Sequence, residues 1–242
     1  MNYFDCLGVK VSETTINKSV KYFFDNFEQS RNKYICCANA HTVVFAYENK
    51  EYKYIMNRSF LVLPDGGPIA NRGGKEVQKV SGVDFFENVL ESINKYKCFF
   101  YGNNKKNLNK LIDKIKGKYP GINICGFEES KFRDLSNKEK EELKKKIVNS
   151  KADIVWVGLG APKQEIFCSD MCRDTNACWI AIGGAFNIMA DIVPRAPKWM
   201  QKHSLEWLYR FIKEPKRLFK RYFIGNAKYI WYSIEYGWKK KN

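Results

Sequence analysis

Short runs of consecutive apolar residues alternate along this chain with segments whose apolar residues recur at helical spacing. The runs predict buried strands at residues 34–38, 60–63, 98–101, 122–126, 153–157 and 177–182. The helical spacing predicts helices at residues 14–29, through 43–47, and at 83–93, 108–115, 138–148 and 164–171. Strands that are apolar throughout and are separated by helices are typical of a parallel sheet covered on both faces. We therefore expect an α/β fold with a Rossmann-like, mostly parallel sheet.

The pattern changes after Pro197, because only helical spacing follows. It runs through residues 199–213, breaks at Glu214 and Pro215, and resumes from residue 216 to about residue 238. Proline is well suited to the first turn of a helix, so Pro215 marks the restart. We expect two parts: an α/β core at residues 1–195 and a C-terminal helical appendage at residues 196–242.

The appendage also carries much of the charge. The whole chain has 242 residues and a formal net charge of +16, and from residue 195 onward 13 Lys and Arg residues stand against three Glu residues, with Trp, Tyr and Phe between them. Amphipathic helices of this composition suit an anionic membrane surface. A helix pair packed on the core with a solvated basic face explains the pattern equally well. No recognisable nucleic-acid module accompanies it, so nucleic acid is not an expected partner.

Neither a secretory leader nor a membrane span is predicted. The first residues lack a charged segment followed by a long apolar one, and no apolar run reaches the ~18 residues that a span requires. The eight cysteines are best interpreted as reduced thiols of a cytoplasmic protein. Three of them cluster, but without the spacing or the histidine of a zinc site, and no other metal motif is present.

Two glycine turns follow predicted strands. Residues 158–165 (GLGAPKQE) come after an apolar strand and open a helix, and Gly183 and Gly184 follow the last strand. Glycines let backbone N–H groups approach an anion, and a helix N-terminus adds a favourable dipole. The first turn lacks the third glycine of a dinucleotide fingerprint and the G-K-[ST] of a P-loop. Each turn alone is equally well explained as an ordinary connection between a strand and a helix. Two such turns at neighbouring strand ends favour a ligand site.

Asp65 directly follows a predicted strand, between Pro64 and a pair of glycines. This sequence is typical of a turn or of a helix N-cap. A carboxylate at the carboxyl edge of a parallel sheet is equally well placed to act as a general base. The residues alone leave both interpretations open.

Several segments together resemble one enzyme family along nearly the whole chain. They are Asn39 with the helix after it and residues 64–66 (PDG), 80–84 (VSGVD), 160–165 (GAPKQE), 195–197 (RAP), 205–210 (LEWLYR) and 214–217 (EPKR). In these segments the chain is similar to the WecG/TagA/CpsF glycosyltransferases, also known as glycosyltransferase family 26. The resemblance implies an enzyme rather than the alternative, a non-catalytic membrane-surface or anion-binding α/β protein.

The resemblance implies an inverting transfer of N-acetylmannosamine or a related hexose from a UDP-sugar to a polyprenyl-diphosphate-linked saccharide. It implies no metal, no cofactor, and a role in teichoic acid or other cell-surface polysaccharide synthesis. The enzyme would sit peripherally on the inner face of the bacterial cell membrane, bound to its anionic surface by the appendage, and homo-oligomer formation stays open.

The same resemblance assigns roles to single residues. Asp65 matches the family's general base. Arg210, Arg217 and Lys220 match residues that stabilise charge on the departing UDP. All of the implied substrate-binding positions are Cys37, Asn39, Lys79, Gly160, Lys163, Gln164, Gly183, Gly184, Asn187, Arg210, Arg217 and Lys220.

Four single positions depart from the family pattern, and the loop Gly66-Gly67-Pro68 is also unusual. Cys37 stands where relatives commonly have Thr, and Lys79 stands where they have Arg, which keeps the charge but loses the bidentate fork. Asn187 replaces a frequent Asp, and Ser204 replaces a Gly. These departures bear on the identity of the donor and the acceptor rather than on the type of reaction.

Overall fold

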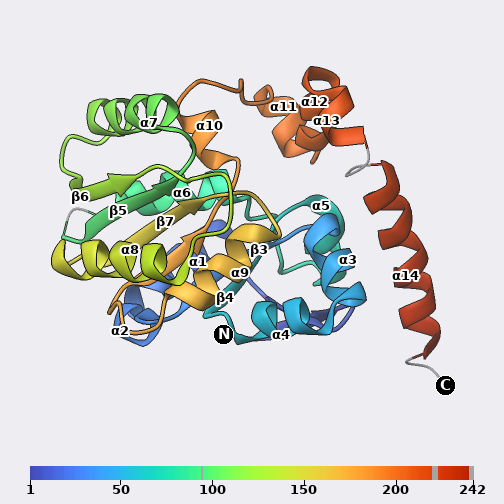
Figure 1. The fold of residues 1–242 in the computed structure, drawn as a ribbon. Coiled ribbons are helices and arrows are strands. Elements are labelled where there is room, and N and C mark those ends of the chain that lie inside the picture. Colours follow the sequence, from blue (N-terminus) through green and yellow to red (C-terminus); the bar gives the residue numbers. More distant parts are fainter. Residues whose placement is uncertain (94, 220–222, 240–242) are drawn as a thin grey trace.

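A six-stranded parallel sheet forms the centre of the molecule (Figure 1). The computed structural model describes residues 1–93, 95–219 and 223–239. The strands are β3 (Tyr34–Ala38), β4 (Leu61–Pro64), β5 (Lys97–Gly102), β6 (Asn123–Glu128), β7 (Ile154–Gly158) and β8 (Cys178–Ala181). They pair in the order β4-β3-β8-β7-β5-β6, and every pairing is parallel. The predicted α/β fold and all six predicted strands are confirmed.

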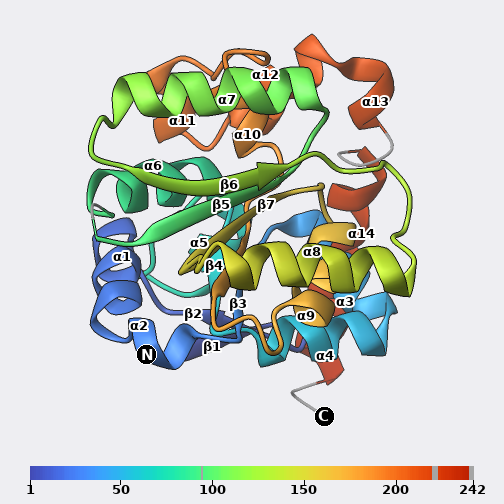
Figure 2. The same cartoon turned by 60° about the vertical axis from the view of Figure 1, so that its left-hand side comes forward.

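Helices cover both faces of this sheet, as Figure 2 shows for α6 and α7 on one side and α8 and α9 on the other. The first face carries α1 (Ile16–Asp25), α2 (Phe27–Ser30), α6 (Gly82–Glu91), α7 (Lys105–Lys118) and α10 (Ala185–Met189). The second face carries α3 (Ala40–Glu48), α4 (Lys50–Arg58), α8 (Asn137–Asn149) and α9 (Lys163–Met171). Successive strand residues point to opposite faces, so Trp156 of β7 joins one core and Val157 the other.

The sequence pattern missed a hairpin at the N-terminus. Strands β1 (Tyr3–Cys6) and β2 (Val9–Ser12) pair antiparallel around Leu7 and Gly8, whose φ angles are 54° and 86°. Two positive φ angles in a two-residue loop match the right-handed twist of paired strands. The Ser12 hydroxyl accepts a hydrogen bond from the Val62 N–H at 3.3 Å, so the hairpin covers the edge strand β4. Short helices α4, α5 (Gly67–Arg72) and α10 were also missed.

The appendage begins differently from its prediction. A single helix over residues 199–213 is wrong, because the structure has α11 (Lys198–Lys202) and α12 (Glu206–Lys213) separated by a turn. Ser204 lies in that turn with φ of 58°, which a helix does not allow. The predicted restart at Pro215 is confirmed, since α13 (Pro215–Phe219) begins there. The rest of the predicted second helix is α14 (Gly225–Lys239), and residues 220–222 lie outside the described part of the chain.

Helix α14 packs along α3 and the N-terminal hairpin through a row of tyrosines. Tyr229 is buried, and its hydroxyl donates to the Pro68 carbonyl at 3.3 Å. The Tyr232 hydroxyl donates to Glu48 Oε1 at 2.8 Å, and the Tyr236 hydroxyl donates to Asp5 Oδ2 at 3.0 Å. Spacings of three and four residues place these side chains on one helix face. In residues 1–93, 95–219 and 223–239, no helix has both the length and the apolar character to cross a membrane.

All eight cysteines are free thiols, and all except Cys125 are buried. Burial raises the pKa of the Cys98 and Cys178 thiols to about 12. The reduced state expected for these residues agrees with their positions in the two cores, where they pack as small apolar side chains.

Candidate active site

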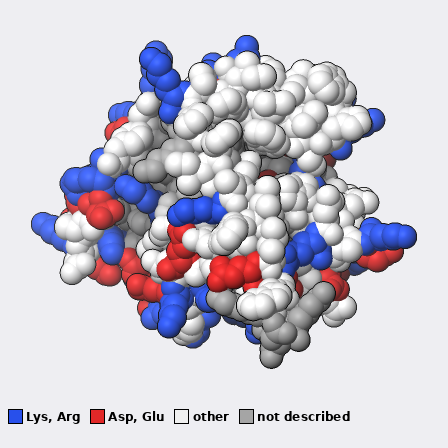
Figure 3. Space-filling view, turned by 90° about the vertical axis from the view of Figure 1, so that its right-hand side faces the viewer, with Lys and Arg blue, Asp and Glu red and all other residues white. Residues whose placement is uncertain are grey.

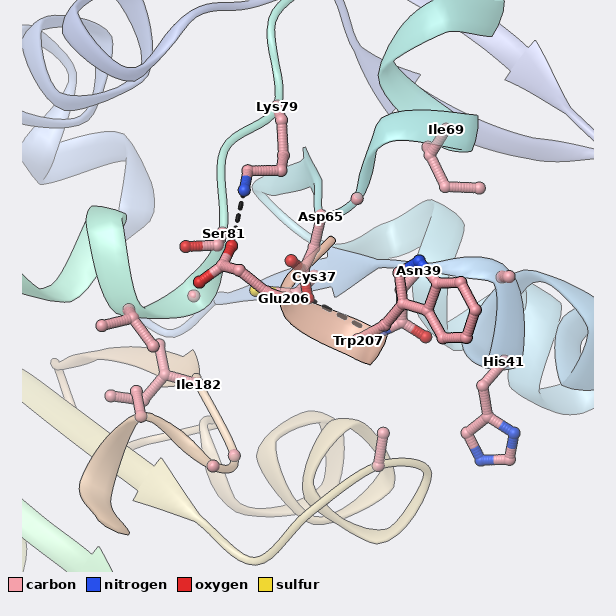
Figure 4. A pocket seen from close by; sticks show the side chains of 18 of the residues that line it. Cys37, Asn39, His41, Asp65, Ile69, Lys79, Ser81, Ile182, Glu206 and Trp207 are labelled. Atoms are coloured by element: carbon pink, nitrogen blue, oxygen red, sulfur yellow. Dashed lines mark hydrogen bonds and ion pairs between the residues drawn. The ribbon is translucent and has the colours of Figure 1, made fainter. Parts of the chain in front are cut away.

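A pocket of about 230 Å³ lies at the carboxyl ends of β3, β4, β7 and β8. Its core side is lined by Cys37, Asn39, Asp65, Gly160, Gln164, Gly183 and Gly184, and its appendage side by Ser204, Glu206, Trp207, Arg210 and Asn226. The volume is below the ~300–1,000 Å³ usual for ligand sites. Side chains of the appendage narrow it, and Figure 4 shows Trp207 over Asn39 and Glu206 near Asp65.

Asp65 is held where β4 gives way to α5. Its N–H donates to the Ala38 carbonyl at 2.8 Å, which extends the pairing of β3 and β4 by one residue. Gly66 follows with φ of 116°, a conformation that favours glycine and turns the chain away from the sheet. The half-buried Asp65 side chain therefore projects into the pocket beside Cys37 and Asn39 (Figure 4).

Asn39 both caps a helix and faces the carboxylate. As N-cap of α3, its Oδ1 accepts from the Thr42 N–H at 3.2 Å, while its own N–H donates to Thr42 Oγ1 at 2.9 Å. This reciprocal capping box fixes the amide so that Nδ2 points the other way. Nδ2 lies 3.5 Å from Asp65 Oδ2. The capping sequence thus orients a donor at the carboxylate.

Cys37 lies behind these two residues at the end of β3. Its Sγ is 3.7 Å from the Ala181 carbonyl, to which it donates. Burial, and then the nearby Asp65 carboxylate, raise the pKa of the Cys37 thiol well above its usual value. Cys37 therefore presents a neutral thiol to the pocket rather than a nucleophile.

The two glycine turns meet at Gln164. Gly160 has φ of 83°, and its N–H donates to Gln164 Oε1 at 3.0 Å. Gly183 has φ of 52°, and a Cβ added there would lie 3.0 Å from the same Oε1. The sequence suggested that the Gly160 N–H binds an anion, but in this structure it donates to the Gln164 side chain. Gln164 therefore ties the turns together as well as lining the pocket.

Arg210 reaches the second glycine turn from α12. A Cβ added to Gly184 would lie 2.9 Å from Arg210 Nη2, so only glycine lets the guanidinium come this close. Among the described residues, the buried Arg210 Nε has no hydrogen-bond partner. Buried donors are normally satisfied, so a cationic donor without a partner at a ligand pocket indicates a place for an acceptor or an anion.

Lys79 connects the core to the appendage. Its Nζ donates to Glu206 Oε2 at 2.5 Å and to the Gln201 carbonyl at 3.1 Å. Nearby, Arg195 contacts Asp84 and donates to Glu87 Oε2 at 2.6 Å. Lys79 lines the pocket as expected, but its charge is paired with Glu206 in this structure.

Two of the predicted substrate-binding residues lie outside the pocket lining. Among the described residues, Lys163 is exposed outside the lining, and Asn187 Oδ1 accepts from Asn103 Nδ2 at 2.6 Å beyond it. The Arg217 side chain and Lys220 lie outside the described part of the chain. Ser204 and the segment with Glu206 and Trp207 belong to the family pattern, but their place at the pocket was not predicted. Neither was that of Asn226, because only the folded appendage brings these residues there. Within the same described residues, no group of three or more His, Cys, Asp or Glu side chains is placed to hold a metal ion.

Comparison with known proteins identifies the class. The model of the glycosyl transferase WecG/TagA/CpsF family matches residues 4–242, so the chain belongs to this family and is a glycosyltransferase. A protein of Bacillus spizizenii is 30% identical over 197 residues, which cover 78% of this chain and 75% of the relative. A protein of Bacillus subtilis strain 168 is 29% identical over 214 residues, which cover 84% and 82%. Both relatives are named N-acetylglucosaminyldiphosphoundecaprenol N-acetyl-β-D-mannosaminyltransferase.

Proposed function

We propose that this glycosyltransferase moves N-acetylmannosamine or a related hexose from a UDP-sugar to a polyprenyl-diphosphate-linked saccharide, with inversion at the anomeric carbon. The names of the two relatives support a polyprenyl-diphosphate acceptor and an aminohexose donor. The observation that carries the proposal is that one pocket holds the carboxylate of Asp65 and the guanidinium of Arg210. A base and a cation facing one cavity suit a transfer in which a proton is removed and a diphosphate departs.

In the proposed reaction, Asp65 accepts the proton of the acceptor hydroxyl as its oxygen attacks the anomeric carbon. The new carbon–oxygen bond forms on one face of the sugar. The bond to the UDP oxygen breaks on the opposite face, and its electron pair leaves with UDP. Asn39 Nδ2, fixed by the capping box, keeps the Asp65 carboxylate oriented for this proton transfer.

Negative charge develops on the diphosphate as UDP departs. We assign its stabilisation to Arg210, whose guanidinium sits against the Gly184 turn and whose Nε has no partner among the described residues. Preorganised cations and donors contribute most where charge develops in the transition state. Arg217 and Lys220 stay part of this proposal as further cations from the same appendage. The proposed transfer uses these cations in place of a metal.

The appendage supports a position at the cytoplasmic face of an anionic membrane. Opposite its tyrosines, α14 exposes Ile230, Trp231, Ile234 and Trp238, each more than 60% exposed. Figure 3 views the side that carries α11–α14 and shows a broad uncharged surface in its upper part, with Lys and Arg around it. Exposed Trp and Ile beside basic side chains are typical of helices that lie in a membrane interface. A lipid-linked acceptor would then meet the pocket from this side.

The test is UDP release from a panel of UDP-sugars, with and without a short-chain lipid-diphosphate N-acetylglucosamine acceptor. We expect release with one donor, dependent on the acceptor and lost in Asp65→Asn at unchanged melting temperature. Asp113→Asn, an exposed carboxylate on α7, is the matched control and should keep wild-type activity.

Two outcomes would count against the proposal. A folded Asp65→Asn variant with near-normal turnover would remove Asp65 as the base. Tight UDP binding without turnover on any donor and acceptor pair would favour the alternative, a non-catalytic anion-binding protein at the membrane surface.

A further inference from the structure

A fully buried carboxyl group is among the residues that line the pocket, and the proposed reaction does not use it. Glu165, in the first turn of α9, has 0% of its surface exposed. Placing a carboxylate in a protein interior costs several kcal/mol unless its oxygens find compensating hydrogen bonds. A buried carboxyl group at this position is costly for stability, so we asked what its contacts do.

One contact of Glu165 is to the residue that ties the glycine turns together. Gln164 Nε2 donates to Glu165 Oε1 at 2.8 Å, and Gln164 Oε1 accepts from the Gly160 N–H at 3.0 Å. A carboxylate only accepts hydrogen bonds, so it selects the NH₂ end of the neighbouring amide. The oxygen end must then face Gly160. Glu165 thus determines which way the Gln164 amide points.

The reverse orientation of this amide would be repulsive at both ends. It would set an NH₂ group against the Gly160 N–H and an amide oxygen against a carboxylate. The amide also packs closely against Gly183, since a Cβ added there would lie 3.0 Å from Gln164 Oε1. The contact therefore holds the two glycine turns in one arrangement.

Titratable groups are packed around Glu165. Burial and then Glu165 raise the pKa of the Cys36 and Cys168 thiols well above the usual value. Burial and then Glu165 also raise the pKa of Tyr52 on α4. These neighbours are neutral at physiological pH, so the Gln164 amide is a polar partner of the Glu165 side chain in otherwise apolar surroundings, where a hydrogen bond is strengthened.

We propose that Glu165 is a positioning residue of this transferase. It holds the Gln164 amide in the single orientation that receives the Gly160 N–H, and it thereby sets the geometry of the two glycine turns against the donor diphosphate. The identity of that ligand rests on the proposed function. The orientation of Gln164 does not.

The first test uses variants that keep the volume of the side chain. In Glu165→Gln the new amide can present either its oxygen or its NH₂ group to Gln164. It therefore no longer selects the NH₂ end of the Gln164 amide. We expect kcat/KM for the UDP-sugar to fall about tenfold, mainly through KM, with the melting temperature unchanged or raised. Glu141→Gln, on the exposed surface of α8, is the control and should change nothing.

The sharper test exchanges the two residues. In the double variant Gln164→Glu/Glu165→Gln, the new carboxylate accepts from Gly160 and from the new amide, which restores the pattern in reverse. We expect this double variant to recover most of the activity that Glu165→Gln and Gln164→Glu lose singly. Losses that simply add in the double variant would overturn the proposal. The double variant also tests the proposal if Glu165→Gln alone does not fold.

A measurement that does not depend on enzyme activity separates this proposal from the proposed function. The Gly160 amide proton, followed by hydrogen exchange in NMR, should be protected in the wild type, exposed in Glu165→Gln and protected again in the exchanged variant. Unchanged protection in Glu165→Gln would overturn the positioning role even if activity falls. A wild type that turns over no donor would refute the proposed function, while the Gly160 result would still decide on Glu165.

Discussion

The two walls of the pocket are built in different ways. The core wall comes from strand ends, where Asp65 continues the pairing of β3 with β4 and Asn39 closes a capping box. The appendage wall comes from α12, which has no buried residue and is held at its start by the pair Lys79–Glu206. One wall is fixed by backbone hydrogen bonds and two apolar cores, and the other by a few side-chain contacts.

This difference assigns different tasks to the walls. A general base needs a fixed position within hydrogen-bonding reach of the proton that it removes, and the core wall supplies one. Arg210, by contrast, lies on a helix that has no buried residue and contributes no strand to the sheet. The comparison therefore predicts that changes in the appendage alter turnover and membrane binding while the core stays folded.

Removing the appendage wall should have the largest effect on activity. Deleting residues 198–242 takes away Trp207, Arg210 and the apolar face of α14 together. We expect turnover on the lipid acceptor to fall below detection and vesicle binding to be lost, while far-UV circular dichroism keeps the signal of the α/β core. A truncated chain that works at the wild-type rate on the lipid acceptor would show that the core wall is sufficient.

Removing only the cation should have the next largest effect. Loss of one preorganised group that stabilises transition-state charge lowers kcat by about 10²–10³-fold, and we expect that for Arg210→Ala. Lys213→Ala, exposed on the same helix, is the matched control. EDTA should leave the wild-type rate unchanged. Rescue of EDTA-treated enzyme by Mg²⁺ or Mn²⁺ would contradict the role given to Arg210.

Membrane binding should depend on the exposed face of α14 rather than on its tyrosines. Burying one large apolar side chain contributes about 1.5–3 kcal/mol, so Trp231→Ala should weaken binding to anionic vesicles about tenfold or more in a sedimentation assay. Tyr54→Ala is a suitable control, because Tyr54 is a 60% exposed aromatic residue on α4. Equal losses in the two variants would argue against α14 as the membrane face.

The smallest effect is expected at the contact between the walls. The side chains of Lys79 and Glu206 are 17% and 21% exposed, and such a pair contributes about 1 kcal/mol. Glu206→Gln should therefore increase amide hydrogen exchange in α12 about fivefold and leave β3 and β4 unaffected. Exchange that rises equally in the sheet would mean that the walls are not independent.

Features that depend on residues close together in the sequence were predicted correctly. The continuous apolar runs predicted all six strands of the parallel sheet, and the position of Asp65 after one of them placed it at the carboxyl edge. The hairpin was missed because β1 and β2 are four residues each, too short for a clear alternation. The break after α11 was missed because a single left-handed residue, Ser204, ends a pattern that otherwise continues.

The appendage wall was the least predictable part of the site. Lys79 and Glu206 are 127 residues apart in the chain, and nothing near either residue announces their pairing. The family pattern also predicted a ligand contact for Asn187, which stays a prediction, and the structure shows a hydrogen bond from Asn103 Nδ2 to Asn187 Oδ1. Contacts between distant segments depend on how helices pack, which neither spacing nor composition encodes.

The free thiols described above make this protein convenient for labelling experiments. Seven of the eight cysteines are buried, and burial raises the pKa of the half-buried Cys125 as well. Thiolates are the species that react with maleimides, so the native cysteines should react slowly at neutral pH. A single cysteine introduced on the exposed face of α14 could then carry a fluorophore or spin label in an otherwise unmodified chain. Whether the label on α14 changes its environment when anionic vesicles are added would then be directly measurable.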